Sequence, residues 1–182
     1  MTCDTNALVS LVTGHWSLVT DKRVNQYPVL KYTNSDIVFQ EIPGEVALAV
    51  NVSGCPCRCP GCHSPYLWRD DGQPLTTDAV DSLVDRCDGN ITCVAVMGGD
   101  AHPDEVDGLM QHLRQRYPWL RTAWYSGRSL LSKAVDLRNF DYVKLGPYLA
   151  HLGNLRNPKT NQRLYRVSDG AMKDITSLFW RK

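Results

Sequence analysis

Three cysteines in one short stretch constrain this chain more than any other feature. Cys55, Cys59 and Cys62 have the spacing Cys-x3-Cys-x2-Cys. Three thiolates can hold three irons of a four-iron four-sulfur cluster and leave the fourth iron open to a ligand, and soft sulfur ligands favour iron-sulfur chemistry. The main alternative is a closed zinc site with four ligands, in which Cys57 or His63 would be the fourth. The spacing therefore predicts a metal site and favours iron and sulfur.

The remaining cysteines argue against a zinc ribbon and against a disulfide framework. Cys3, Cys87 and Cys93 are isolated, whereas a zinc ribbon usually has a second, distant Cys-x2-Cys pair. Four of the seven cysteines crowd between residues 55 and 62, which is typical of metal ligation rather than of a secreted scaffold. We interpret Cys57, between the first two predicted ligands, as a loop residue that binds no metal. A reducing, cytoplasmic location is expected.

Length and charge exclude several classes of protein. A chain of 182 residues that is 43% hydrophobic is long enough for one domain with a core. We expect a single domain over residues 1–182, with an N-terminal extension of unknown role over residues 1–30. A formal net charge of +1 provides no field for nucleic acid or an anionic membrane. No apolar run approaches the length of a membrane span, and the start of the chain lacks the basic leader of an export signal.

Apolar runs alternate with segments of helical periodicity. Strands are predicted at residues 46–52, 91–97, 120–125 and 142–145, with a further short strand near Tyr165. Helices are predicted at residues 77–88, 103–117 and 130–135, and a terminal helix is predicted around Met172, Ile175 and Phe179. This alternation is typical of an α/β fold with a mostly parallel sheet. Because four βα units cannot close an eight-unit barrel, we expect an open, partial (βα) barrel.

An unusual loop follows each predicted parallel strand. The cysteines follow the first, Gly98-Gly99-Asp100 the second, Ser126-Gly127 the third and Gly146-Pro147-Tyr148 the fourth. The carboxyl ends of parallel strands share one rim, where such folds gather ligand-binding groups. Glycines let the backbone approach a ligand closely, and Asp100 can accept a hydrogen bond from an ammonium group. These residues are expected to face a single pocket.

Five segments together resemble a known family. They are residues 54–68, 97–100, 125–127, 144–148 and 160–163. In these segments the chain is similar to the activating enzymes of anaerobic class III ribonucleoside-triphosphate reductases, within the radical S-adenosylmethionine (SAM) superfamily. The most specific parts are the continuation from Cys62 to Trp68 and the pairing of Gly-Pro-Tyr with Asn-Gln-Arg. The resemblance implies a partial barrel of the radical SAM type.

The resemblance also implies a reaction and its partners. A reduced [4Fe-4S] cluster would pass one electron to SAM and cleave it to methionine and a 5′-deoxyadenosyl radical. This radical would abstract hydrogen from a glycine Cα of the large subunit of the anaerobic reductase. A flavodoxin or ferredoxin type of electron donor is implied. No catalytic residue beyond the cluster ligands Cys55, Cys59 and Cys62 is required.

The cofactor contacts carry over position by position. The backbone from Gly61 through Cys62 to His63 would contact the adenine end of SAM, and Gly98, Gly99 and Asp100 would hold the methionine end. Ser126 and Lys144 are further cofactor-binding candidates. Simpler roles stay open for three of these residues: His63 as a stacked or capping residue, Ser126 as part of a turn, and Lys144 as a solvated charge at a strand end.

Two features depart from the superfamily, and two other functions stay open. Gly61 occupies a position that is aromatic in many superfamily members, and residues 1–30 match no motif; there, Trp16 and Tyr27 are expected to cover the core. The loops at residues 146–148 and 154–163 are expected to border the opening and meet the reductase. The alternatives are another radical SAM enzyme, acting on a different protein or a small molecule, and a non-enzymatic zinc-binding module.

Overall fold

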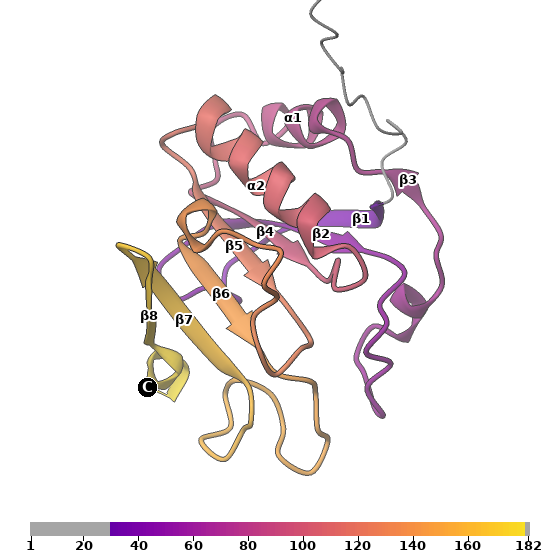
Figure 1. Cartoon of the computed structure of the whole chain (residues 1–182), viewed down its shortest axis with the longest axis vertical. Coiled ribbons are helices and arrows are strands. Elements are labelled where there is room, and N and C mark those ends of the chain that lie inside the picture. Colours follow the sequence, from indigo (N-terminus) through magenta and orange to yellow (C-terminus); the bar gives the residue numbers. More distant parts are fainter. Residues whose placement is uncertain (1–29, 181–182) are drawn as a thin grey trace, which may run out of the picture.

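One mixed sheet of eight strands organises residues 30–180, the part of the chain that the computed structural model describes (Figure 1). The strands are β1 (Lys31–Val38), β2 (Ala47–Val52), β3 (Gln73–Pro74), β4 (Cys93–Met97), β5 (Arg121–Tyr125), β6 (Tyr142–Leu145), β7 (Arg163–Ser168) and β8 (Ala171–Asp174). The helices are α1 (Thr77–Asp85) and α2 (Pro103–Arg116), with short 3-10 helices η1 (Pro65–Trp68), η2 (Leu137–Asn139) and η3 (Thr176–Trp180). The roles expected of Trp16 and Tyr27 fall outside the described residues.

The parallel centre of the sheet confirms the predicted fold class. Strands β2, β4, β5 and β6 are neighbours and pair in parallel, and they coincide with the four apolar runs. The sheet is open, as expected for a partial barrel, because its order runs β3-β1-β2-β4-β5-β6-β7-β8. Both edges are antiparallel: β1 and β3 extend one side, and β7 and β8 the other. The sequence did not predict β1, because this strand, next to the edge of the sheet, has no apolar run.

The prediction of a helix at residues 130–135 is wrong. The connection from β5 to β6 contains only the short η2. Leu130 is 81% exposed, whereas Leu131 and Val135 pack against the core without a helix. A segment this short cannot offset the cost of starting a helix. The expected alternation of strand and helix therefore holds for α1 and α2 but not for the later connections.

The predicted terminal helix is only partly correct. Met172 lies on β8, and just the last part of the segment is helical, as η3. The cause is the turn at Asp169-Gly170, where both residues have positive φ angles, 51° and 73°. An Asp-Gly pair in this conformation joins two antiparallel strands by a tight hairpin, and Ser168 pairs with Ala171 across it. The Asp-Gly signal in the sequence outweighs the helical spacing of the apolar residues.

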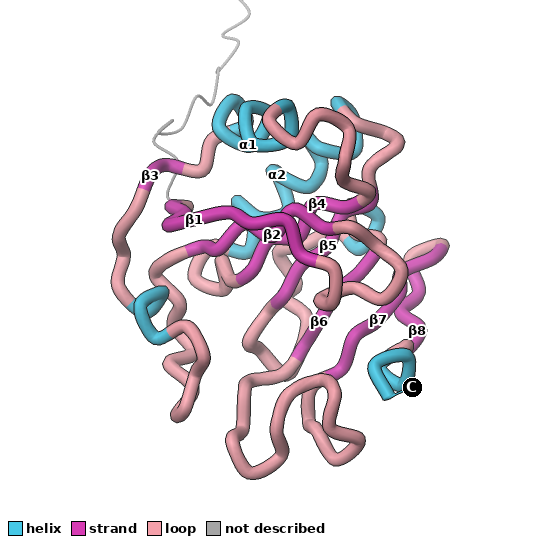
Figure 2. Tube along the Cα trace, turned by 180° about the vertical axis from the view of Figure 1, so that it is seen from behind, coloured by secondary structure: helices cyan, strands magenta, loops and turns pink. Residues whose placement is uncertain are grey.

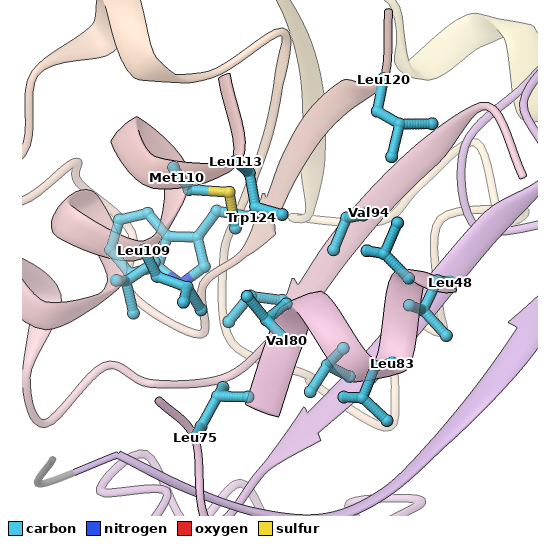
Figure 3. Close-up of a cluster of buried hydrophobic side chains, with 14 of the residues drawn as sticks. Leu48, Leu75, Val80, Leu83, Val94, Leu109, Met110, Leu113, Leu120 and Trp124 are labelled. Atoms are coloured by element: carbon cyan, nitrogen blue, oxygen red, sulfur yellow. The ribbon is translucent and has the colours of Figure 1, made fainter. Parts of the chain in front are cut away.

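Two hydrophobic clusters lie on opposite faces of the sheet. The larger one joins β2, β4 and β5 to the apolar sides of α1 and α2, and Figure 3 shows members from all five elements, including Val80, Met110 and Trp124. The smaller one faces away from these helices and has alanines in the sheet, covered by Ile42 and Leu155 from loops. Cys87 and Cys93 are buried in these clusters, as predicted for cysteines that are not ligands. None of the helices described here is long and apolar enough to cross a membrane.

Helix α2 packs closely on the turn that follows β4, because Gly99 has no side chain. Its φ angle is +81°, and a Cβ atom there would lie 2.5 Å from Cγ2 of Val106. The Gly99→Ala variant is expected to lower the free energy of unfolding by about 2 kcal/mol, through steric overlap and a strained backbone. Urea denaturation measures the change. Gly108→Ala is the matched control: Gly108 lies within α2 with open space around it, so alanine there should stabilise the protein by about 0.5–1 kcal/mol. Equal effects of the two substitutions would contradict the packing argument.

Candidate functional site

The carboxyl ends of the four parallel strands bring the predicted site residues to one edge of the sheet. In Figure 1 the loops that follow β2, β5 and β6 extend from the lower edge, and Figure 2 shows the same edge from behind. The cysteine loop, residues 54–64, lies between β2 and η1. Hydrogen bonds between neighbouring loops confirm that these segments are in contact, although they are far apart in the sequence.

Asp100 is the centre of these contacts. Its carboxylate is 5% exposed and accepts a hydrogen bond from the Ser126 hydroxyl at 2.5 Å and from the Gly127 N–H at 2.9 Å. The Cys57 thiol donates to the same carboxylate, with Sγ 3.8 Å from Oδ2. Ser126 therefore does more than close a turn: it joins the loop after β5 to the loop after β4. Three donor groups from two loops fix the direction of the Asp100 side chain.

A cavity of about 400 Å³ borders this carboxylate. It is lined by Asp100, Ala101, Pro103, Trp124, Arg128, Leu130 and Ser132. Its volume is in the range of small-molecule sites.

Backbone hydrogen bonds give the cysteine loop a closed base. The N–H groups of Gly54 and Cys55 donate to the carbonyls of Arg69 and Leu67, both at 2.9 Å. All the thiols of the loop are partly buried. The Cys62 sulfur accepts a hydrogen bond from the Ser64 N–H at 3.4 Å, a contact of the kind that tunes the potential of iron-sulfur clusters.

The three predicted ligands do not form a group close enough to share one zinc ion. Zinc–sulfur bonds of about 2.3 Å in a tetrahedron place thiolates about 3.8 Å apart. Among the described residues, the one group of three or more ligand atoms within 4.8 Å of one another consists of Cys55, Cys57 and Asp100, so Cys55, Cys59 and Cys62 are not drawn together around one ion. In a cluster each cysteine binds a different iron. The thiolates that hold a cluster are therefore expected to lie farther apart than those around one zinc ion.

Cys57 does not have the character of a metal ligand. Burial and, to a lesser extent, the neighbouring Asp100 carboxylate together raise the pKa of its thiol to about 12. Metal binding requires the thiolate, which this environment disfavours. The prediction that Cys57 is no ligand is thus consistent with its surroundings, yet its side chain points into the site rather than away from it.

Lys144 is buried inside the site, which rules out the solvated strand-end charge considered above. The side chain is 7% exposed, and Nζ donates to the Gly146 carbonyl at 2.6 Å and to the Ser126 carbonyl at 3.5 Å. Burial lowers the pKa of this amine to about 8, while Asp100 and the cysteines of the loop oppose the fall. An ammonium group has three donors, so one remains for a ligand.

The depressed pKa of Lys144 gives a testable pH dependence. Between pH 8 and pH 10.5 the unfolded chain binds up to one proton more than the folded protein at this residue, so the contribution of Lys144 to stability rises with pH over this window. From pH 8 to pH 9.5 this contribution should increase by roughly 1.5 kcal/mol. The thiols of Cys57 and Cys93, whose pKa values are raised by burial, act in the opposite direction, so the difference between the wild type and a variant without the amine isolates the Lys144 contribution. Urea denaturation of the metal-free protein at both pH values measures it. The Lys144→Met variant should lack this part of the rise; an identical pH dependence in both proteins would refute the assignment.

The remaining predicted residues lie at the same edge but differ in their contacts. The His63 ring packs edge-on against Tyr148, with ring centroids 5.0 Å apart, so the cysteine loop contacts the loop after β6. Gly61 lies beside Tyr148 as well. The N–H of Gly98 donates to the Tyr125 carbonyl at 3.0 Å, and its carbonyl accepts from the Trp124 indole at 2.7 Å. The polar groups of Gly98 are therefore already used inside the protein.

Three residues that the sequence analysis did not predict form a row with Lys144 at the ends of the strands. Asn51, Met97, Tyr125 and Lys144 are register partners across β2, β4, β5 and β6. They share the face that lies away from the helices, where Met97 and Tyr125 pack against the smaller cluster. The first three are only partly buried, whereas the alanines two residues before them on each strand are buried. The row could have been found from the alternation of strand residues, because each member is the last on that face.

Comparison with known proteins identifies the domain. A profile of the 4Fe-4S single cluster domain family matches residues 43–162. The chain belongs to this family. The family is of the radical SAM type, so a [4Fe-4S] cluster and SAM are the cofactors, as expected. The match covers the cysteine loop, the loops after β4, β5 and β6, and most of the partial barrel, and it gives no support to a zinc-binding module.

Several relatives share one name, anaerobic ribonucleoside-triphosphate reductase-activating protein. The relative from Escherichia coli K12 is 35% identical over 85 residues, which are 40% of this chain and 55% of that protein. The relative from Salmonella typhi is 38% identical over 64 residues, 32% and 42% of the two chains. The relative from Enterobacteria phage T4 is 26% identical over 140 residues, 67% and 85% of the two chains. The alignments span about half the length of the two bacterial relatives. No solved structure matches the chain significantly.

Proposed function

We propose that this protein activates an anaerobic ribonucleoside-triphosphate reductase by generating a glycyl radical on its large subunit. The observation that carries the proposal is a chain of hydrogen bonds at one edge of the sheet: the cysteine loop binds Asp100 through Cys57, Asp100 binds Ser126, and Lys144 donates to the Ser126 carbonyl. This arrangement places a carboxylate, Asp100, and an amine, Lys144, near the loop that carries the three predicted cysteine ligands. The names of the relatives support the reductase as the partner.

Cys55, Cys59 and Cys62 are the residues that would hold the cluster. Each would bind one iron, and the fourth iron would remain open. When bound and reduced, the cluster supplies the electron that cleaves SAM to methionine and a 5′-deoxyadenosyl radical. The protein residues contribute binding, orientation and exclusion of water, as expected where a cofactor carries the difficult chemistry.

Asp100 and Lys144 would hold the methionine end of SAM. The Asp100 carboxylate, fixed by Ser126 and Gly127, is suited to the ammonium group, and the third donor of Lys144 to the carboxylate. Gly98 would then shape the turn that presents Asp100 rather than bind SAM itself, because its polar groups already have partners. Gly99 would contribute its backbone N–H to the methionine end. A pair of oppositely charged side chains fixes which way round an amino acid lies.

The row at the ends of the strands would form the floor under the adenosyl group. Met97 and Tyr125 offer partly buried apolar surface on the face away from the helices, and Asn51 adds one amide group. A floor of this kind limits the access of water, which a highly reactive radical requires. The residues around His63, whose ring packs on Tyr148, would close the adenine end.

The direct test is an activation assay without oxygen. The reduced, cluster-loaded protein is mixed with SAM and the large subunit of a class III reductase. We expect 5′-deoxyadenosine together with a glycyl radical detected by electron paramagnetic resonance. Cys59→Ala should abolish both products, because one iron ligand is lost. Formation of 5′-deoxyadenosine with no radical on the reductase would overturn this proposal and favour a radical SAM enzyme with another substrate.

Tyr148 tests where the partner binds. Its side chain is partly exposed in the loop after β6, beside the cysteine loop. Arg163, the other residue expected to meet the partner, instead donates to the carbonyls of Thr160 and Gln162 and pairs with Asp174, so it braces the loop.

We expect Tyr148→Ala to reduce glycyl-radical formation about tenfold, as loss of an interface aromatic can, and to change SAM cleavage in the absence of reductase by less than twofold. The matched control is Trp119→Ala, an aromatic residue that is 70% exposed and precedes β5, at the opposite edge of the sheet. This variant should activate the reductase normally. Parallel loss of cleavage and activation in Tyr148→Ala would refute a partner-binding role.

A further inference from the structure

Cys57 occupies a defined place between three loops. Its Sγ atom lies 3.8 Å from Oδ2 of Asp100. The Cys55 and Cys57 sulfurs and a carboxylate oxygen of Asp100 all lie within 4.8 Å of one another. Cys57 therefore joins the cysteine loop to the carboxylate that would bind the ammonium group of SAM.

The fit of the Cys57 sulfur against Gly127 explains why that residue is glycine. A Cβ atom on Gly127 would lie 2.6 Å from Sγ and 3.1 Å from Cβ of Cys57. The φ angle of Gly127 lies outside the left-handed region, so the backbone itself would accept another residue. Contact with Cys57 is what demands glycine here. The same Gly127 donates its N–H to Asp100, so sulfur, glycine and carboxylate form one packed unit.

We propose that Cys57 is a positioning residue that locks the cysteine loop onto Asp100 and Gly127, and thereby sets the separation between the open iron and the group that binds the ammonium of SAM. This inference rests on the proposed function. The base of the cysteine loop is closed by backbone hydrogen bonds. Beyond that base, the thiol of Cys57 donates the hydrogen bond that connects the cysteine loop to the loop after β4. A shift of about 1 Å in such a geometry is enough to impair a reaction strongly.

The test is a double-mutant cycle between Cys57 and Gly127 in the full-length, cluster-loaded protein. Iron and sulfide content, the dissociation constant of SAM, and the electron paramagnetic resonance spectrum of the reduced cluster with and without SAM are measured under nitrogen. We expect Cys57→Ala to keep its iron and sulfide, to bind SAM about tenfold more weakly and to show a smaller spectral response to SAM.

Gly127→Ala should weaken SAM binding by a similar factor in the wild-type background, because its methyl group displaces the sulfur. In the Cys57→Ala background the same substitution should have an effect of less than threefold, because the space is then free. Such dependence of one substitution on the other is the signature of direct contact.

Two further variants control for loss of a cysteine as such. Cys57→Ser keeps a small hydrogen-bond donor in the same place and should restore SAM binding to near the wild-type level. Cys87→Ala removes a buried cysteine at the end of α1 whose thiol bonds only to the Leu83 carbonyl in the described structure, and should bind SAM normally.

Each other outcome overturns the inference. Unchanged SAM binding and an unchanged spectrum in Cys57→Ala would make Cys57 a bystander. Loss of iron from Cys57→Ala and Cys57→Ser alike would make it a ligand. Independent, additive effects of the two substitutions would exclude the contact. A wild-type protein whose cluster does not respond to SAM would overturn the proposed function and this inference together, whereas a normal wild type with an unaffected Cys57→Ala variant would overturn the inference alone.

Discussion

The site depends on the hydrogen bonds that the buried carboxylate of Asp100 accepts. They come from Ser126 and Gly127 on the loop after β5, and from Cys57 on the cysteine loop. Burying a carboxylate is costly unless donors surround it, so these loops are stable only when they come together. The same donors fix the direction of the charge, which is what a site for an ammonium group requires.

The sheet brings these loops together and also determines how open the site is. Parallel pairing of β2, β4, β5 and β6 brings their carboxyl ends to one edge, and α1 and α2 cover the same face of the sheet. The opposite face has alanines beneath a row of larger, partly buried residues. A complete barrel would close around that row, whereas an open one leaves a side through which a segment of another protein can enter.

Much of the fold and most of the candidate site could be predicted because local patterns determine them. Apolar runs gave the four parallel strands, since a strand buried on both faces must be apolar throughout. Strand β1 and the row from Asn51 to Lys144 could not be found that way, because partly buried positions mix polar and apolar residues. The helix expected near Leu130 does not form, although Leu131 and Val135 pack on the core, because the segment is too short to offset the cost of starting a helix.

The sequence by itself determined the cofactor chemistry expected of this protein, and the tertiary structure decided which side chains lie beside the cysteine loop. The spacing of Cys55, Cys59 and Cys62 predicts an iron-sulfur site because three thiolates on one short loop leave an iron free. The roles of Lys144 and Cys57 could not be read from their neighbours in the chain. Burial of the Lys144 amine and the contact of Cys57 with Gly127 arise between segments far apart in sequence, and only folding brings those segments within reach of one another.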